Sequence, residues 1–148
     1  MIVAIALISA LLRPSTLISL VDFLSLWFEN NTPRDIYYAD LGTRYLCEQG
    51  GVQPVVILQN DKGNAFGSTT IIAPITSQSK NKHFLPTHML IHYRHLHQNS
   101  MILFEQIRTI DKSRLSDYIC HMRKEDIKEM DLIIGVSLGL KGSKSYEL

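Results

Sequence analysis

The sequence has little excess charge, few cysteines and none of the short motifs that mark several enzyme classes. Its 148 residues carry a formal net charge of +1, so a nucleic-acid-binding surface would have to be a local patch. The two cysteines, Cys47 and Cys120, form no C-x-x-C pair, which is more typical of a reducing compartment than of a disulfide framework. The sequence contains no Walker, G-x-G-x-x-G or H-E-x-x-H motif, so nothing supports the enzyme classes that carry them.

The composition is that of a globular protein of one domain. Hydrophobic residues make up 45% and charged residues 20% of the chain, and its length is enough to bury a core without disulfides or metals. We therefore expect a soluble, cytoplasmic protein.

The first 28 residues are unusually apolar and carry only two charged side chains, Arg13 and Asp22. A secretory signal would need a positive start and a small-residue cleavage site, and a membrane span would not be interrupted by Arg13-Pro14. A helical hairpin packed on the domain, or an extension from an upstream start, remains; membrane contact through residues 1–28 stays open but is not favoured. We expect an apolar, helical extension at 1–30, the main domain at 33–140 and a tail at 141–148.

Most of the main domain reads as short strands separated by turns. "GTRYLCEQGG" (42–51) reads as a loop, "DKGNAFGS" (61–68) as a turn and "SQSKNKHFLP" (77–86) as a polar loop. One clear helix is predicted at 123–140, with Gly139 at its end. This pattern predicts a mainly β protein, a small barrel with a helical cover. The expected strands are 35–41, 52–60, 69–76, 87–93 and 100–111, the last as one long strand or a bent pair, and 114–122 is a helical turn or a strand.

Three groups of residues could carry chemistry. Glu48, Gln49 and the glycines at 50 and 51 could let the backbone approach a ligand, or could simply form a tight turn. In "LFEQIRTIDKSRL" (103–115), strand alternation would place Phe104, Gln106, Arg108 and Ile110 on one face, with Leu103, Glu105, Ile107 and Thr109 on the other. Gln could read a base edge and Arg could hold a phosphate, although a solvated strand face is the simpler interpretation.

The third group is a run of histidines, H-x-x-H-x-H, at positions 92, 95 and 97. Metal ligation needs convergent geometry and stricter spacing, so we interpret "HYRHLHQN" as a polar connection and expect no metal.

In order along the chain, "DIYYADL", "EQGGVQPVVILQND", "IIAPITSQ", "LPTHM", "LFEQIRTIDKSRL" and "SLGL" resemble the MazF/PemK family of toxin–antitoxin ribonucleases over about residues 33 to 140. This resemblance implies an SH3-like β-barrel that forms a homodimer and needs no cofactor. It implies sequence-specific, metal-independent cleavage of single-stranded RNA to 2′,3′-cyclic phosphate and 5′-hydroxyl ends. A cognate antitoxin, and operator DNA through the toxin–antitoxin complex, are the other implied partners.

The resemblance also assigns roles to individual residues. The catalytic pair of the family, a Thr and an Arg, matches Thr76 and Gln53. The residues implied to line the RNA groove are Glu48, Gln49, Gln106 and Arg108.

This chain departs from the family pattern at the catalytic Arg position. Gln53 offers a neutral amide, which can hydrogen-bond a phosphate but cannot neutralise a developing charge. Leu46 and Cys47 also replace a small Gly-Ser pair, and Arg44 in the same loop is a candidate substitute cation. Two hypotheses follow: a ribonuclease with a weakened site, or an impaired member that still binds an antitoxin and operator DNA as a dimer.

Overall fold

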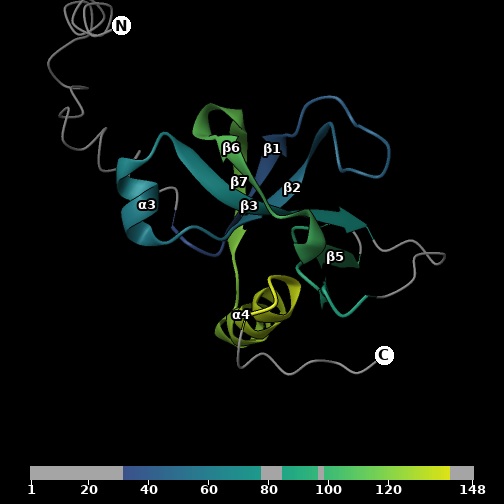
Figure 1. Cartoon of the computed structure of the whole chain (residues 1–148). Helices are drawn as coiled ribbons and strands as arrows, with labels where there is room; N and C mark the ends of the chain where they lie inside the picture. The colour runs from purple at the N-terminus through teal and green to yellow at the C-terminus, as the bar shows by residue number, and fades with distance from the viewer. Residues whose placement is uncertain (1–31, 78–84, 97–98, 141–148) are drawn as a thin grey trace, which may run out of the picture. The chain divides into compact units, whose positions relative to one another are not determined.

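The computed structural model describes residues 32–77, 85–96 and 99–140, all within one compact unit, Asn31–Leu148 (Figure 1). The apolar extension predicted at 1–30 and the tail predicted at 141–148 lie outside these residues. Among the described residues, no helix is both long enough and apolar enough to cross a membrane.

The strands form an antiparallel sheet in the order β4-β5-β3-β2-β1-β7, and β6 also pairs with β3. The mainly β fold with one C-terminal helix is therefore confirmed. The strands are β1 (Asp35–Asp40), β2 (Val52–Ile57), β3 (Thr69–Ser77), β4 (His88–Ile91), β5 (Ser100–Leu103), β6 (Arg108–Asp111) and β7 (Leu115–His121). The helical elements are α3 (Asp61–Phe66), η1 (Phe104–Gln106), η2 (Lys112–Arg114) and α4 (Lys124–Ser137).

Strand β3 organises the sheet because its two halves pair with different partners. Thr69–Ile72 pairs with β6, whereas Ile75–Ser77 pairs with β5, and β2 lies along its other edge. In Figure 1, β3 runs across the centre of the fold.

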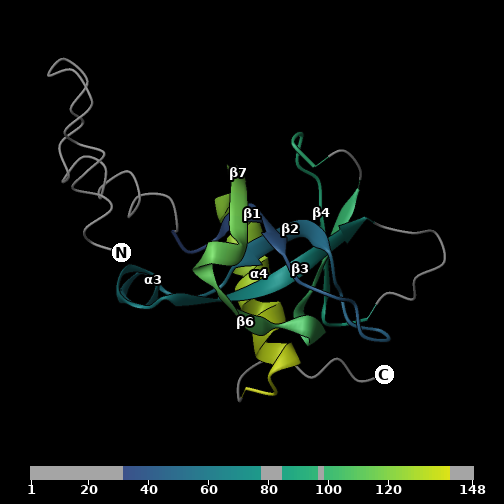
Figure 2. The same ribbon diagram turned by 90° about the horizontal axis from the view of Figure 1, so that it is seen from above.

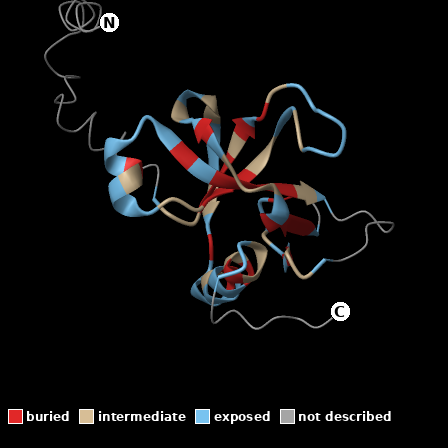
Figure 3. Ribbon diagram, viewed as in Figure 1, coloured by how far each residue is buried: buried red, intermediate tan, exposed pale blue. Residues whose placement is uncertain are grey.

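Both faces of the central strands are buried, as Figure 3 shows in red. Alternation along β2 sends Val56 into a cluster with Met130 and Ile133 of α4, while Val55 and Ile57 enter a second cluster with Ile110. A strand buried on both faces has a continuous apolar run, which explains why "VVI" does not alternate with polar residues.

Helix α4 packs beside β4 and η1. Figure 2, in which the fold is seen from above, shows α4 running across the strands of the sheet. Gly139 has φ +64, in the left-handed region, just after the helix. A glycine in that position closes a helix without strain, so the predicted end of α4 is confirmed.

A polar network fixes the start of α4. Tyr93 donates a hydrogen bond to Asp126 and accepts one from the Arg123 amide at 2.9 Å. Burial, with the hydrogen bond to Asp126 adding to it, raises the pKa of Tyr93 to about 12, from its ordinary 10.0. The folded state therefore favours the neutral phenol, and this contribution to stability is complete below pH 10.

We expect the free energy of unfolding to fall as the pH rises from about 10 to about 12, because Tyr93 ionises in the unfolded chain first. Tyr93→Phe should lower stability at neutral pH by about 1 kcal/mol and make that alkaline slope shallower. Denaturant titrations across this pH range would measure both effects. The exposed Tyr45→Phe is the control, and an unchanged slope in Tyr93→Phe would contradict the expectation.

Two details of the sequence-based assignment were wrong. Residues 61–66 form a helix instead of a turn, because the Asn60 side chain accepts a hydrogen bond from Gly63 N at 2.8 Å and caps the first turn. Residues 100–111 form a bent pair of strands, as one of the two expected alternatives had it, but the face alternation predicted across 103–110 fails because the 3-10 turn η1 lies between β5 and β6. Phe104 and Ile110 consequently enter different core clusters and do not share a strand face.

Candidate functional site

Gln53 and Thr76 line the same pocket, of about 350 Å³. The pairing of β2 with β3 brings them together. Val55 lies opposite Pro74, and the same antiparallel register continued by two residues places Gln53 opposite Thr76. The two side chains assigned as the catalytic pair by resemblance therefore line one pocket from neighbouring strands.

The rest of this pocket is neutral. Its other lining residues are Tyr38, Pro54, Ile75, Ser77, Leu96 and Ser100. Hydroxyl and amide groups can hold phosphate oxygens by hydrogen bonds, but they cannot supply a full positive charge. Among these described lining residues there is no Lys, Arg or His, so the pocket can orient a phosphate better than it can stabilise added negative charge.

The two glycines before β2 are needed for different reasons. Gly51 has φ +74, which side-chain-bearing residues adopt at a cost. Gly50 lies against the Arg44 backbone, where a Cβ would come within 2.6 Å of the Arg44 Cα. Both glycines shape the 42–51 loop itself, so the tight-turn interpretation accounts for them.

The same loop holds Leu46 at φ +47. A branched residue in the left-handed region stores backbone strain, of about 1–2 kcal/mol. The Arg44 Nε donates to the Leu46 carbonyl at 3.2 Å, so this guanidinium is turned back onto its own loop. Arg44 is not among the residues that line the pocket of Gln53 and Thr76.

The four residues implied to line an RNA groove lie together beside a second pocket, of about 260 Å³. Glu48, Gln106 and Arg108 line it with Glu105 and Ile107. Gln106 Oε1 accepts from the Gln49 amide at 2.8 Å, and an Arg108 Nη donates to the Gln49 carbonyl at 2.8 Å. Gln106 Nε2 also donates to the Cys47 carbonyl at 3.3 Å, so both ends of its amide are engaged within the protein.

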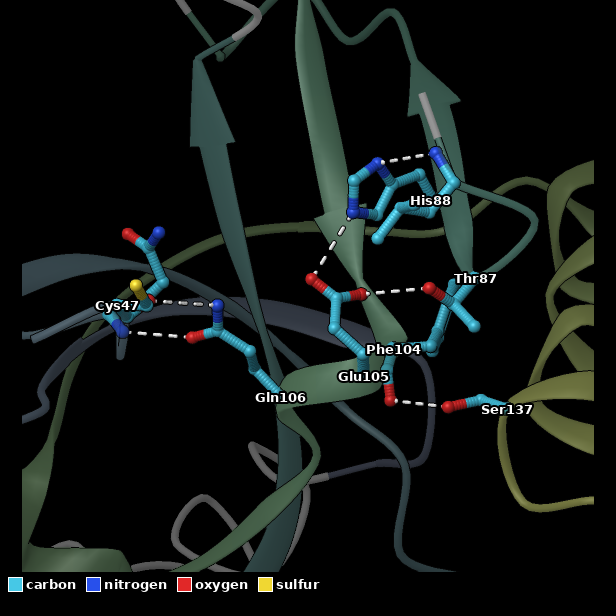
Figure 4. Close-up of polar contacts among 9 residues, drawn as sticks. Cys47, Thr87, His88, Phe104, Glu105, Gln106 and Ser137 are labelled. Carbon is cyan, nitrogen blue, oxygen red and sulfur yellow. Dashed lines mark hydrogen bonds and ion pairs between the residues drawn. The ribbon is translucent and has the colours of Figure 1, made fainter. Parts of the chain in front are cut away.

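Sequence reasoning missed the residues that hold η1 in place. Glu105 bonds to His88, the first residue of β4, and to Thr87, which precedes that strand (Figure 4). No spacing in the sequence signals this contact, because the two segments meet only when β4 pairs with β5.

Positive charge gathers near the second pocket. Burial lowers the pKa of the Arg108 guanidinium, Arg114 adds to this effect and Glu48 opposes it. Burial also lowers the pKa of Lys112. The side chain of Arg114 lies beside Gly42 at the base of the 42–51 loop. Arg108 and Arg114 form a local basic patch on a chain whose net charge is only +1, whereas the Lys112 ammonium donates to the Asn64 carbonyl of α3.

Within the described ranges, no group of three or more His, Cys, Asp or Glu residues is arranged to hold a metal ion. His92 bonds to Asn99 at 2.9 Å, and His88 is buried against Glu105. His97 lies outside the described residues, so the predicted polar connection is only partly visible.

Comparison with known proteins gives matches over nearly all of the described chain. Residues 32–138 match the family model of the PemK-like, MazF-like toxin of type II toxin–antitoxin systems. Endoribonuclease MazF of Staphylococcus saprophyticus is 44% identical over 116 residues, 76% of this chain and 95% of that protein. Endoribonuclease EndoA of Bacillus subtilis is 47% identical over 108 residues, 72% of this chain and 92% of that protein.

Solved structures share the fold. Crystalline MazF from Deinococcus radiodurans superposes with a TM-score of 0.63 at 19% identity, covering 74% of this chain and 97% of that one. A mycobacterial endoribonuclease in complex with its cognate antitoxin gives a TM-score of 0.62 at 19% identity, covering 74% and 96%.

Proposed function

The chain belongs to the PemK-like, MazF-like toxin family of type II toxin–antitoxin systems, and on that premise we propose that it is a sequence-specific endoribonuclease. Its substrate is single-stranded RNA in the cytoplasm, and its toxin domain spans residues 33–140. Two relatives that are named endoribonucleases and align over more than nine-tenths of their length support this proposal.

The observation that carries the proposal is the shared pocket of Gln53 and Thr76. Cleavage by an RNA 2′-hydroxyl needs a proton acceptor for that hydroxyl, a proton donor for the leaving 5′ oxygen and stabilisation of the phosphorane between them. In this proposal the Thr76 hydroxyl and the Gln53 amide hydrogen-bond the scissile phosphate. The 2′ oxygen gives up its proton to solvent water and bonds to phosphorus as the bond from phosphorus to the 5′ oxygen breaks. The 5′ oxygen takes a proton from water, which leaves a 2′,3′-cyclic phosphate and a 5′-hydroxyl, with no metal ion.

The weak point of this site is charge. Replacing an arginine by glutamine in a partly desolvated site costs about 3–5 kcal/mol of transition-state stabilisation, roughly a hundred- to several-thousand-fold in rate. Thr76 and Gln53 are both partly buried, so water screens their interactions only in part. The proposed enzyme is therefore slow, with binding groups in place and the stabilising cation missing.

The RNA strand would run from this pocket along the 42–51 loop toward the basic patch. Arg108 and Arg114 supply positive charge on that path, and single-stranded nucleic acid follows such charge along a protein surface. Glu48 and Glu105 lie at the edge of the second pocket, where base edges rather than phosphates would be accommodated.

The neutral pocket favours a second candidate function. A member with a disabled site would still fold and dimerise, and would still bind an antitoxin segment in the same groove. One solved neighbour is described as an endoribonuclease in complex with its cognate antitoxin. In this alternative the toxin–antitoxin complex, rather than the toxin alone, would bind operator DNA.

Incubating the full chain with a long mixed-sequence RNA in EDTA separates the two candidates. The endoribonuclease proposal predicts discrete internal cuts at one short sequence, which sequencing of product ends would map. No cleavage by the native chain over long incubation, together with tight antitoxin binding, would support the second candidate. Progressive shortening of the RNA from its termini, without internal cuts, would contradict an endoribonuclease.

A further inference from the structure

Gln106 and Arg108, assigned above to the RNA groove, form hydrogen bonds with the backbone of the 42–51 loop instead. Gln106 accepts from the Gln49 N–H and Arg108 donates to the Gln49 C=O, each at 2.8 Å, so both polar groups of one peptide residue are held. Gln106 also donates to the Cys47 carbonyl at 3.3 Å. We call these three hydrogen bonds, from Gln106 and Arg108 to Cys47 and Gln49, the loop latch.

Gln106 belongs to η1, which is held in place by bonds to the rest of the fold. Phe104, at the start of η1, is buried at 1% exposure, and its carbonyl accepts from the Ser137 hydroxyl of α4 at 2.8 Å (Figure 4). Glu105 accepts from Thr87 at 3.0 Å and lies 3.2 Å from His88 Nε2. Three successive residues of η1 thus bond to three different segments: α4, the start of β4 and the loop.

The His88 ring is itself oriented. Its Nδ1 accepts from the Leu85 amide at 3.1 Å, so the ring proton lies on Nε2 and is donated to Glu105. A buried imidazole with both nitrogens engaged fixes the carboxylate, and the carboxylate fixes η1 from which Gln106 extends.

The loop in turn contacts the candidate catalytic pocket. Gly50, which follows Gln49, accepts from the Gln53 amide at 3.4 Å. Backbone bonds from Leu41 to Gly51, at 2.9 Å, and from Gly51 to Gly42, at 2.7 Å, close the base of the loop. A change in the position of Gln49 therefore moves the Gly50 carbonyl that orients Gln53.

We propose that Gln106 and Arg108 are positioning residues, which latch the 42–51 loop so that Gly50 holds Gln53 in the catalytic pocket. We infer that Gln106 does not read a base in this arrangement, because its carbonyl oxygen and one N–H of its amino group hold the loop. Releasing them toward RNA would break two hydrogen bonds and free the loop. The Arg108 Nε is buried without a hydrogen-bond partner, so this side chain is held by its surroundings rather than extended toward solvent.

This inference rests on the proposed ribonuclease function for its effect on catalysis, but the latch itself can be measured without RNA. Hydrogen–deuterium exchange of the full chain reports the protection of the Gln49 amide, which is the donor in the latch. Gln106→Ala should lower that protection by about tenfold or more, since two hydrogen bonds to the loop are lost. Gln106→Glu keeps the acceptor but loses the donor to Cys47, and should lower it by less.

Gln49→Ala is the matched control. The latch binds only the backbone of Gln49, so this variant should keep the protection of the Gly51 amide, while Gln106→Ala should lose it. In cleavage assays, Gln106→Ala should lower kcat by about tenfold with little change in KM and none in the preferred sequence, because the lost interaction orients a catalytic group.

Unchanged exchange of the loop in Gln106→Ala and Gln106→Glu would overturn the latch, whatever the activity. A changed cut sequence with the loop still protected would also overturn it and assign Gln106 to base reading. A loosened loop in a chain that cleaves no RNA, even as Gln53→Arg, would leave the latch standing and refute the ribonuclease proposal. If Gln106→Ala fails to fold, Gln106→Glu provides the test. Partly lowered protection of the Gln49 amide in that variant would support the latch, and unchanged protection would overturn it.

Discussion

Replacing Gln53 by arginine should raise the rate of RNA cleavage by at least about tenfold, and by as much as several thousand-fold. Gln53 lines a pocket of about 350 Å³ opposite Thr76, so a guanidinium there would face the same phosphate that the amide faces now. It would add a permanent positive charge and a planar set of donors to a lining that is otherwise neutral. Single-turnover cleavage of an RNA with a mapped site would measure the gain.

Two further substitutions at this position separate charge from shape. Gln53→Lys supplies the charge without the planar fork and should give only part of the gain, while Gln53→Leu removes the amide and should fall below the native rate. If arginine, lysine and leucine all leave the rate near that of the native chain, the missing cation does not limit catalysis.

Thr76→Val should lower kcat by about a hundred- to a thousand-fold, which makes it the largest expected loss. Valine keeps the branched shape of threonine and suits the strand, so the backbone pairing of Thr76 with Met101 should persist. What disappears is the hydroxyl that we assign to the scissile phosphate. The comparison is best made in the faster Gln53→Arg background, where a large decrease can still be measured.

Thr69→Val is the matched control for this prediction. Thr69 begins the same strand, is exposed and lies away from the pocket, so its loss of a hydroxyl should leave kcat unchanged. Equal rates for Thr76→Val and Thr69→Val, with both proteins folded by circular dichroism, would remove Thr76 from the reaction.

Arrangements that depend on local pattern could be predicted from the sequence. The apolar run of β2, the 3.6-residue period of α4 and the left-handed Gly139 each reflect forces within a few neighbouring residues. The 3-10 turn η1 could not be predicted in this way. The alternation of residues 103–110 fits a strand, but the bonds of Glu105 and Gln106 to distant segments favour the turn.

The candidate site likewise combines features that the sequence predicts with contacts between distant segments that it does not predict. Only the resemblance to a family paired Thr76 with Gln53, and the strand register then explains why residues so far apart in sequence share a pocket. The resemblance also put Gln106 in the RNA groove, yet its amide bonds to a loop 57 residues away along the chain. Side-chain contacts of that range depend on how the strands are arranged, and no spacing rule encodes them.

The loop latch also explains how the strained backbone of Leu46 is maintained. Leu46 adopts φ +47 within the loop to which the latch is bonded. Strain of this kind persists only when surrounding contacts impose it. The bonds from Gln106 to Cys47 and Gln49, just beyond Leu46, provide that constraint.

The central claim is that this chain cleaves RNA by attack of the 2′-hydroxyl. The most direct test uses two RNA oligonucleotides that span a mapped site, one of them with a single 2′-deoxynucleotide at the position before the cut. Products formed in EDTA would be weighed by mass spectrometry. The account predicts a 2′,3′-cyclic phosphate and a 5′-hydroxyl from the all-RNA strand, and an intact deoxy-substituted strand. Cleavage of both strands, or products that carry 5′-phosphates, would contradict it.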